Sequence, residues 1–329
     1  MIIKIIMIFD DNFDYQLIYF NIKLATAKQI MSKYSFVYMS KFQKQLKAGS
    51  KFQLKDFPTH IDKISPEEAK KELKQVRKDI ANIQEVMYAH NKYSVLICLQ
   101  GMDTAGKDSL IREVFKDFNA RGVVVQSYKT PSFKELQHDY LWRHYIALPE
   151  RGKFTVFNRT HYENVLVTRV HPEYILQENI PGITKVKDIP KDFWKSRYQQ
   201  INNFEHHICQ NGTILLKFYL HLSKSEQKSR LLRRLDKEDH NWKFSPGDLK
   251  ERRRWNEYMS YYQEAIQHTS KQQTPWYIIP ADNKEICRYL VAQVILEELK
   301  KYKDITYPDL PPDIEKHIAL YRKELENEK

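Results

Sequence analysis

The sequence predicts an α/β fold built on a mainly parallel, five-stranded sheet. Five short apolar runs alternate along the chain with stretches of helical periodicity, which is the pattern of strands joined by helical crossovers. No long Gly-, Ser- or Pro-rich linker separates these runs, so one main domain is expected. The predicted strands are YSVLICL (93–99), GVVVQSY (122–128), KFTVFN (153–158), TILLKFYL (213–220) and PWYIIPA (275–281).

Helices are predicted before, between and after these strands. Residues 66–91 repeat apolar side chains at helical spacing, with Ser65 as an N-cap and Glu68 three positions later. The segment 109–118 follows the first strand and is predicted to be a helix. The segment 284–302 is apolar at the spacing of a helix that packs on the sheet.

Composition favours a protein that handles polyanions. The chain has 329 residues, of which 54 are Lys or Arg and 42 are Asp or Glu, giving a net charge of +12. Such an excess suits nucleic acid, anionic lipid or phosphorylated ligands, although a basic surface without a specific partner remains an alternative. Cys98, Cys209 and Cys287 are far apart, which favours thiols in a reducing cytoplasm over disulfides or zinc ligands.

The amino terminus is the one segment that raises a membrane question. Residues 1–9 are apolar apart from Lys4, but the run is shorter than the ~20 residues that span a bilayer. No membrane span is therefore expected. A signal peptide with a cleavage site at ATA (25–27) is one alternative, and a natural start at Met31, with residues 1–30 as an extension, is another.

The stretch LQGMDTAGKDSLIR (99–112) has the spacing of a phosphate-binding loop. Gly101, Gly106 and Lys107 are arranged as G-x4-G-K between a predicted strand and a predicted helix. In that setting, backbone N–H groups and the helix N-terminus face an anion, and the lysine adds a charge. A glycine-containing turn with solvent-facing charges is the alternative for the motif alone.

The same loop contains two carboxylates, Asp103 and Asp108, which would repel phosphates unless divalent cations lay between them. Magnesium prefers hard oxygen ligands, so Asp103 is predicted to hold Mg2+ against a transferring phosphoryl group. Asp108 stands where Ser or Thr usually follows the lysine. It is expected either to bind metal through water or to cap the helix.

A second group of polar residues follows the third predicted strand, in VFNRTHYENVLVTRV (156–170). P-loop enzymes commonly place an acidic metal residue at this strand end, where this chain has Asn158. Arg159 and Arg169 can neutralise charge on a transferring group, and Glu163 lies nearby in sequence. Standing alone, the stretch would be interpreted as a strand end followed by a polar helix.

A third group is the basic segment 229–255. Arg230 and Arg234 are four residues apart and share a helix face. A basic helical flap of this kind is typical of a kinase lid, which closes over the site and excludes water. A solvated charged helix is the alternative.

Together, these stretches resemble the second family of polyphosphate kinases over roughly residues 45–305. The resemblance implies a P-loop kinase-like, three-layer α/β/α fold with a helical lid. It also implies Mg2+-dependent transfer of a terminal phosphoryl group between inorganic polyphosphate and a nucleotide. Many members have Asp at the position of Asn158, whereas FNR(S/T)HYE is similar to the subgroup that phosphorylates both AMP and ADP. Asn164 stands where that subgroup often has a second acid, which leaves acceptor preference open.

The resemblance also assigns roles to single residues. Asp103 and Lys107 match the Walker A loop, Arg159 and Arg169 the Walker B region, and Arg143 a basic position of the substrate channel. The predicted catalytic residues are Asp103, Lys107, Asn158, Arg159, Glu163 and Arg169, with Asp103 as the metal ligand. The predicted phosphate- and nucleotide-binding residues are Gly101, Ala105, Gly106, Asp108, Ser109, Arg143, Arg230, Arg234 and Lys243.

The expected organisation is an N-terminal helical segment (31–92), a P-loop kinase domain (93–305) with its lid at about 224–262, and a helical tail (306–329). Expected ligands are polyphosphate, AMP, ADP and guanine nucleotides, in a cytoplasmic homodimer or tetramer that binds neither nucleic acid nor membrane. Two alternatives stay open: an ATP-dependent small-molecule kinase of the same fold, and a nucleic-acid-binding protein. The latter is disfavoured because the sequence lacks an RNP motif, a zinc finger or a Gly-rich basic tail.

Overall fold

The computed structural model describes residues 45–49, 51–241 and 244–328. The chain divides into two units, 1–46 and 47–329, and the second is described here. The proposed extension 1–30, the start at Met31 and the predicted site residue Lys243 lie outside the described residues.

The described residues form a five-stranded sheet in the order β2-β3-β1-β4-β5, and every pairing is parallel. This confirms the predicted fold class. The central strand is buried along its whole length, as expected for a strand covered on both faces. The strands are β1 (Ser94–Gln100), β2 (Val123–Ser127), β3 (Phe154–Asn158), β4 (Thr213–His221) and β5 (Trp276–Pro280).

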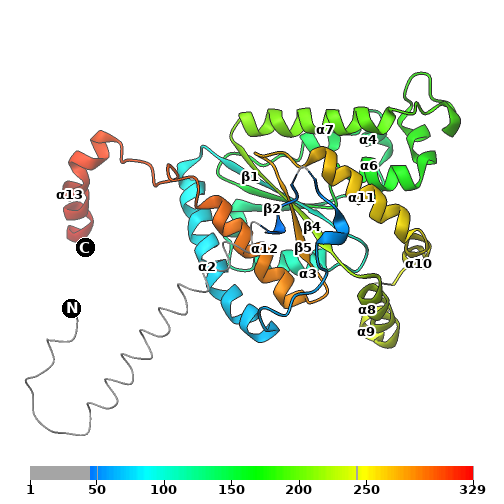
Figure 1. Ribbon diagram of the computed structural model, residues 1–329. Helices are drawn as coiled ribbons and strands as arrows, with labels where there is room; N and C mark the ends of the chain where they lie inside the picture. The colour runs from blue at the N-terminus through cyan, green and yellow to red at the C-terminus, as the bar shows by residue number, and fades with distance from the viewer. Residues whose placement is uncertain (1–44, 50, 242–243, 329) are drawn as a thin grey trace, which may run out of the picture. The chain divides into compact units, whose positions relative to one another are not determined.

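Helices cover both faces of the sheet and complete the three layers (Figure 1). The helices packed together on one face are α2 (Pro66–His90), α3 (Lys107–Val114) and α12 (Lys284–Leu299). Those packed together on the other are α6 (Glu163–Val170), α7 (Phe193–Gln210) and α11 (Trp255–Thr269).

The predicted first helix forms for the expected reasons. The Ser65 side chain accepts a hydrogen bond from the Glu68 N–H, and Asn91 ends α2 in the left-handed conformation. Of the apolar positions that the spacing predicted, Leu73, Val76 and Ile80 are buried, whereas Ile83 and Val86 are only half-buried. The helix also buries Ala69, Gln84 and Met87, and it packs against α12.

Shorter elements connect these layers. They are η1 (Leu54–Asp56), η2 (Ala120–Gly122), α4 (Phe133–Leu136), α5 (Trp142–Tyr145), η3 (Pro172–Glu178), η4 (Val186–Asp188), α8 (Lys224–Asp236), α9 (Glu238–Asn241), α10 (Pro246–Arg253) and α13 (Pro312–Asn327). Within the described ranges, no helix is both long and apolar enough to cross a bilayer. All three cysteines are free thiols, and two of them are buried.

A buried ion pair fixes the segment that follows β3. Lys217 of β4 donates to Glu205 of α7 over 2.6 Å, and both side chains are almost completely buried. The Tyr162 hydroxyl donates to the same carboxylate over 2.6 Å, and the His161 ring lies 3.2 Å from it. Tyr162 and His161, which closely follow Arg159, are therefore held in place by hydrogen bonds to the buried Glu205 carboxylate.

Candidate active site

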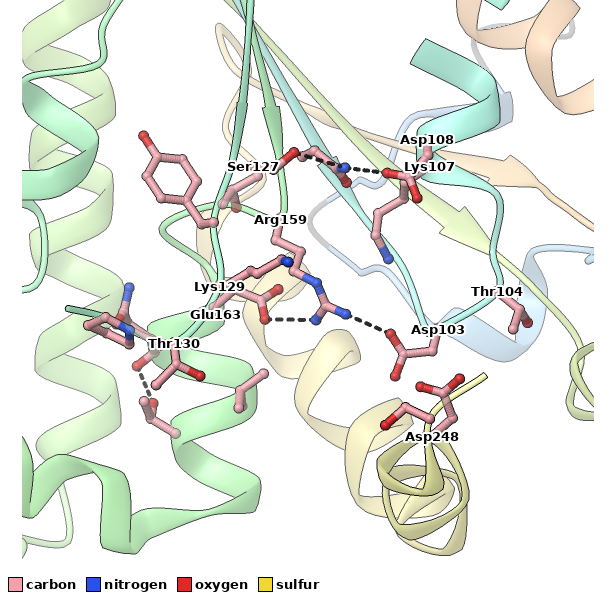
Figure 2. Close-up of a pocket in the computed structure, with 18 of the residues that line it drawn as sticks. Asp103, Thr104, Lys107, Asp108, Ser127, Lys129, Thr130, Arg159, Glu163 and Asp248 are labelled. Carbon is pink, nitrogen blue, oxygen red and sulfur yellow. Dashed lines mark hydrogen bonds and ion pairs between the residues drawn. The ribbon is translucent and has the colours of Figure 1, made fainter. Parts of the chain in front are cut away.

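A cavity of about 1050 Å³ opens at the carboxyl ends of β1, β2 and β3. Its walls come from the loops that follow these strands and from α6, α8 and α10 (Figure 2). The loops after β1 and β3 lead to helices on opposite faces of the sheet. Ligands of open parallel sheets bind at such a switch point.

The predicted phosphate loop forms the turn between β1 and α3. Gly101 has a φ of 154°, and a Cβ there would lie 3.0 Å from the Leu220 carbonyl oxygen, so the backbone approach requires glycine. Lys107 begins α3 and donates to the Gly101 carbonyl over 2.7 Å. Burial, and then the nearby Arg159, lower the pKa of Lys107 to about 8.

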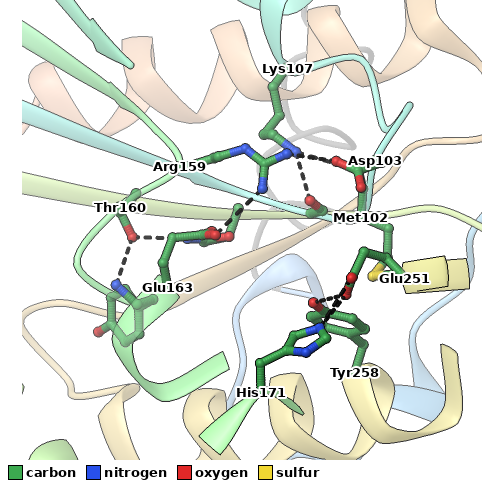
Figure 3. Close-up of polar contacts among 12 residues, drawn as sticks. Met102, Asp103, Lys107, Arg159, Thr160, Glu163, His171, Glu251 and Tyr258 are labelled. Atoms are coloured by element: carbon green, nitrogen blue, oxygen red, sulfur yellow. Dashed lines mark hydrogen bonds and ion pairs between the residues drawn. The ribbon is translucent and has the colours of Figure 1, made fainter. Parts of the chain in front are cut away.

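Arg159 joins this loop to the segment after β3. Its φ of 60° is unusual for a residue other than Gly, Asn or Asp. This backbone conformation marks a tight turn directly after the strand. The guanidinium lies 2.7 Å from Asp103 and 3.4 Å from Glu163 (Figure 3). Glu163 is the main cause that raises the pKa of Arg159, so the guanidinium stays charged.

Gln100 positions Glu163 and was not predicted from the sequence. Its side chain is buried at the end of β1 and donates to the Glu163 carboxylate over 2.9 Å and to the Thr160 hydroxyl over 3.1 Å. The signal in the sequence was a polar residue directly after the apolar run 95–99. A buried amide with two partners holds the carboxylate in one orientation.

Asn158, at the end of β3, forms a bridge between neighbouring strand ends. Its amide nitrogen donates to Asp108 over 2.6 Å and to the Ser127 hydroxyl over 3.3 Å. Figure 2 shows Ser127 and Asp108 at the two ends of this bridge. The Asn158 amide oxygen is buried and has no hydrogen-bond partner among the described residues.

Arg230 has a structural role that the sequence did not suggest. Its side chain is 4% exposed and pairs with Glu226 over 2.8 Å. The rest of the guanidinium donates to the carbonyls of Thr104 and Ala105 in the phosphate loop and of Ala281 and Asp282 after β5. It thus connects α8 to the phosphate loop, and its expected contact with phosphate stays a prediction.

Arg234 lies one turn further along α8 and lines the cavity. It pairs with Asp248 of α10 over 3.0 Å. The predicted pair of arginines therefore shares a helix but has two different sets of partners. The α8–α10 segment also contacts the end of α6, because His171, which follows α6 directly, lies 3.0 Å from Glu251 (Figure 3).

The remaining predicted residues are not all at the cavity. Arg143 lines it, pairs with Glu135 over 3.2 Å and stacks near Tyr128. Arg169 is not among the residues that line it; this arginine pairs with Glu264 of α11 over 2.7 Å, so its catalytic role stays a prediction. Gly106, Asp108 and Ser109 line the cavity, whereas Gly101 and Ala105 shape the loop behind it.

The structure adds cavity residues that sequence reasoning missed. Lys129 and Thr130 follow β2, Arg233 lies on α8, and Lys284 begins α12. Burial, and then Arg230, lower the pKa of Lys284. The signal for Lys129 was available, since the carboxyl ends of parallel strands meet at one edge of a sheet.

The arrangement suits a phosphate-rich ligand with a hard cation. Lysine and arginine side chains line the cavity from several segments. The backbone of the phosphate loop and the N-terminus of α3 lie on the same side and can bind an anion. Oxygen donors that line the cavity include Asp103, Asp108, the partnerless amide oxygen of Asn158 and Asp248, which are of the type that Mg2+ prefers. Within the described ranges, no cluster of three His, Cys, Asp or Glu residues could hold a metal without other ligands.

Comparison with known families gives one consistent match. The profile described as polyphosphate kinase 2 matches residues 63–306. An ADP-polyphosphate phosphotransferase of Rhodopseudomonas palustris is 43% identical over 279 residues, which cover 84% of this chain and 95% of that protein. An AMP/ADP-polyphosphate phosphotransferase of Meiothermus ruber is 38% identical, with 80% of this chain and 93% of that protein covered.

A solved structure supports the same likeness at the level of the fold. The crystal structure of polyphosphate kinase 2 from Arthrobacter aurescens is similar to this chain with a TM-score of 0.77 and 32% sequence identity. The similarity covers 84% of this chain and 95% of that one. The residues that match the polyphosphate kinase 2 profile, 63–306, include the whole sheet and the helices that carry the cavity.

Proposed function

The chain belongs to the polyphosphate kinase 2 family, and from this premise we propose that it transfers the terminal phosphoryl group of inorganic polyphosphate to AMP and to ADP. The reaction is reversible in principle. The observation that carries the proposal is that Arg159 pairs with both Asp103 and Glu163. These residues line a large basic cavity together with Lys107. A long polyanion needs such a charged path and no code for reading bases.

The acceptor is itself a phosphate, so its attacking oxygen is already anionic and no residue has to remove a proton. Catalysis then consists of positioning and of stabilising charge on the transferring group. Lys107 and Arg159 supply positive charge, and Arg159 is kept in place by its two carboxylate partners. Gln100 in turn fixes Glu163.

Magnesium is the cofactor we propose, held by Asp103 with further oxygen donors of the loop. When bound, it neutralises phosphate charge during transfer. Asp103 also pairs with Arg159 over 2.7 Å, so the same carboxylate positions the guanidinium. Lys107 donates to the carbonyls of Gly101 and Met102, and we propose that its ammonium group turns towards an anion that enters.

We further propose that the α8–α10 segment acts as a lid. Arg233 and Arg234 line the cavity from this segment, while Arg230 ties α8 to the phosphate loop. Closure would bring Arg233 and Arg234 over the phosphates and exclude water. A dimer or tetramer, a cytoplasmic location and the use of guanine nucleotides belong to the same proposal.

The test is an assay without ATP. The protein is incubated with polyphosphate, Mg2+ and either AMP or ADP, and products are resolved by anion-exchange chromatography. We expect ADP and then ATP from AMP, and ATP from ADP. Lys107→Met serves as a control that lacks the loop cation.

Two outcomes would replace the proposal. Product that forms only with ATP as donor would identify an ATP-dependent small-molecule kinase. Salt-sensitive binding of single-stranded DNA without any turnover would identify a nucleic-acid-binding protein. Accumulation of ADP from AMP, with ADP refused as a substrate, would remove the second acceptor.

A further inference from the structure

The pair Asp108–Asn158 reverses the usual chemistry of a P-loop metal site. In P-loop NTPases, the residue after the loop lysine is a neutral Ser or Thr, and the neighbouring strand end supplies an acidic residue; together they hold Mg2+. Here the loop position is Asp108 and the strand end is Asn158. The pair still contains one carboxylate and one neutral oxygen donor. The carboxylate, however, is in the loop, and the neutral donor is at the strand end.

The structure brings these two residues into direct contact. Strands β1 and β3 are neighbours in the sheet, with Leu99 opposite Asn158, so the loop after β1 passes beside the end of β3. The Asn158 amide nitrogen lies 2.6 Å from the Asp108 carboxylate. A pair of residues on two different segments can therefore act as one set of ligands.

The orientation of the Asn158 amide follows from this contact. An ionised carboxylate only accepts hydrogen bonds, so the amide nitrogen contacts Asp108 and the amide oxygen is left for another partner. Asn158 is 9% exposed, and its oxygen has no partner among the described residues. An unpaired buried acceptor is destabilising unless a ligand or an ordered water uses it.

Capping of α3 explains only part of this arrangement. Asp108 lies in the first turn of the helix, where a negative charge is favourable. Capping does not account for the partnerless oxygen of Asn158 or for its position in the wall of the cavity. A cation that approaches both oxygens explains the two observations together.

We propose that Asp108 and the amide oxygen of Asn158 form a divalent-cation subsite in which the carboxylate has moved from the strand end to the phosphate loop. The proposal rests on the proposed function, because the cation arrives with a phosphate ligand. This subsite is additional to Asp103, the Mg2+ ligand proposed above, whose carboxylate also pairs with Arg159. Asp103 and Asp108 then have different protein partners, Arg159 and Asn158.

The experiment measures ligand binding and needs no turnover. ADP and inorganic tripolyphosphate are titrated calorimetrically in excess Mg2+ and in EDTA, and the metal increment is defined as the ratio of the Kd in EDTA to the Kd in Mg2+. Asp108→Asn should lower the increment for at least one ligand by about tenfold or more. In EDTA the same variant should bind at least as tightly as the wild type, because a repulsive charge is gone.

Two further variants exchange the carboxylate. Asp108→Ser combined with Asn158→Asp restores the usual P-loop arrangement and should recover most of the increment. Asn158→Asp alone places two carboxylates at the 2.6 Å contact, so its melting temperature should fall in EDTA and rise again with Mg2+. Asp62→Asn removes the same charge from an exposed position and is the control.

An unchanged increment in Asp108→Asn overturns the proposal, as does an equal loss of affinity in Mg2+ and EDTA, which would indicate a cap alone. Failure of the exchanged double variant to recover the increment also overturns it. These binding results are independent of the phosphotransfer assay. If the increments behave as expected but AMP and ADP are not phosphorylated, the subsite stands and the proposed function fails.

Discussion

Replacing Arg230 by lysine should destabilise the protein although the charge is kept. The guanidinium donates to four carbonyl oxygens, two in the phosphate loop and two after β5. A hydrogen bond from a charged donor contributes about 1.5–3 kcal/mol, and contacts that share one group are not additive. A lysine ammonium is a compact point charge that cannot reproduce the planar fork. We expect a loss of about 3–5 kcal/mol in the free energy of unfolding, which corresponds to losing about two of these charged hydrogen bonds.

The assay is thermal unfolding followed by circular dichroism without ligands, with Arg234→Lys as the matched control on the same helix. A loss of this size corresponds to a decrease of roughly 10 °C in melting temperature. Arg234 is 25% exposed and pairs with Asp248, so its lysine variant should lose less than about 1 kcal/mol. If Arg230→Lys melts within about 2 °C of the wild type, the reasoning about the four carbonyls is wrong.

Three further predictions concern other charges. Glu205→Leu or Lys217→Met alone should each destabilise the fold by about 3–5 kcal/mol, and the double variant by less than the larger single loss, which urea unfolding would measure. At pH 8 Lys107 is partly neutral, and a bound phosphate raises its pKa, so phosphate binding should be accompanied by proton uptake. Calorimetry in buffers of different ionisation enthalpy measures this uptake, and Lys107→Arg should abolish it. Asp103→Asn should lower kcat by ~10²–10³, and near wild-type kcat at saturating Mg2+ would exclude the assigned role.

The sheet could be predicted closely because strands buried on both faces are continuous apolar runs. The predicted run 153–158 contains β3 at Phe154–Asn158, and the run 93–99 differs from β1 by one residue at each end. The first helix was equally clear from its cap. The helix after the loop was set too late and too long: α3 spans Lys107–Val114, since Gly106 starts it in a left-handed conformation and Phe115 leaves helical geometry.

The site divides in the same way. The spacing of the phosphate loop identified Lys107, because local backbone geometry determines that motif. Gln100 was missed because its partner Glu163 is 63 residues away, and no local pattern connects them. The carbonyl partners of Arg230 could not be predicted either, because every residue has a backbone carbonyl and the sequence does not distinguish those that accept a side-chain hydrogen bond.

The central place of β1 in the sheet has a consequence for biosynthesis. Its partner β4 lies far along the chain: Ser94 faces Thr213, 119 residues later. At about 5–20 residues per second, the ribosome takes roughly 6–24 s to add that distance. During this interval a mostly apolar strand has an unsatisfied edge, which is a template for pairing with other chains. The nascent protein should therefore depend on chaperones that shield β1 until β4 has emerged.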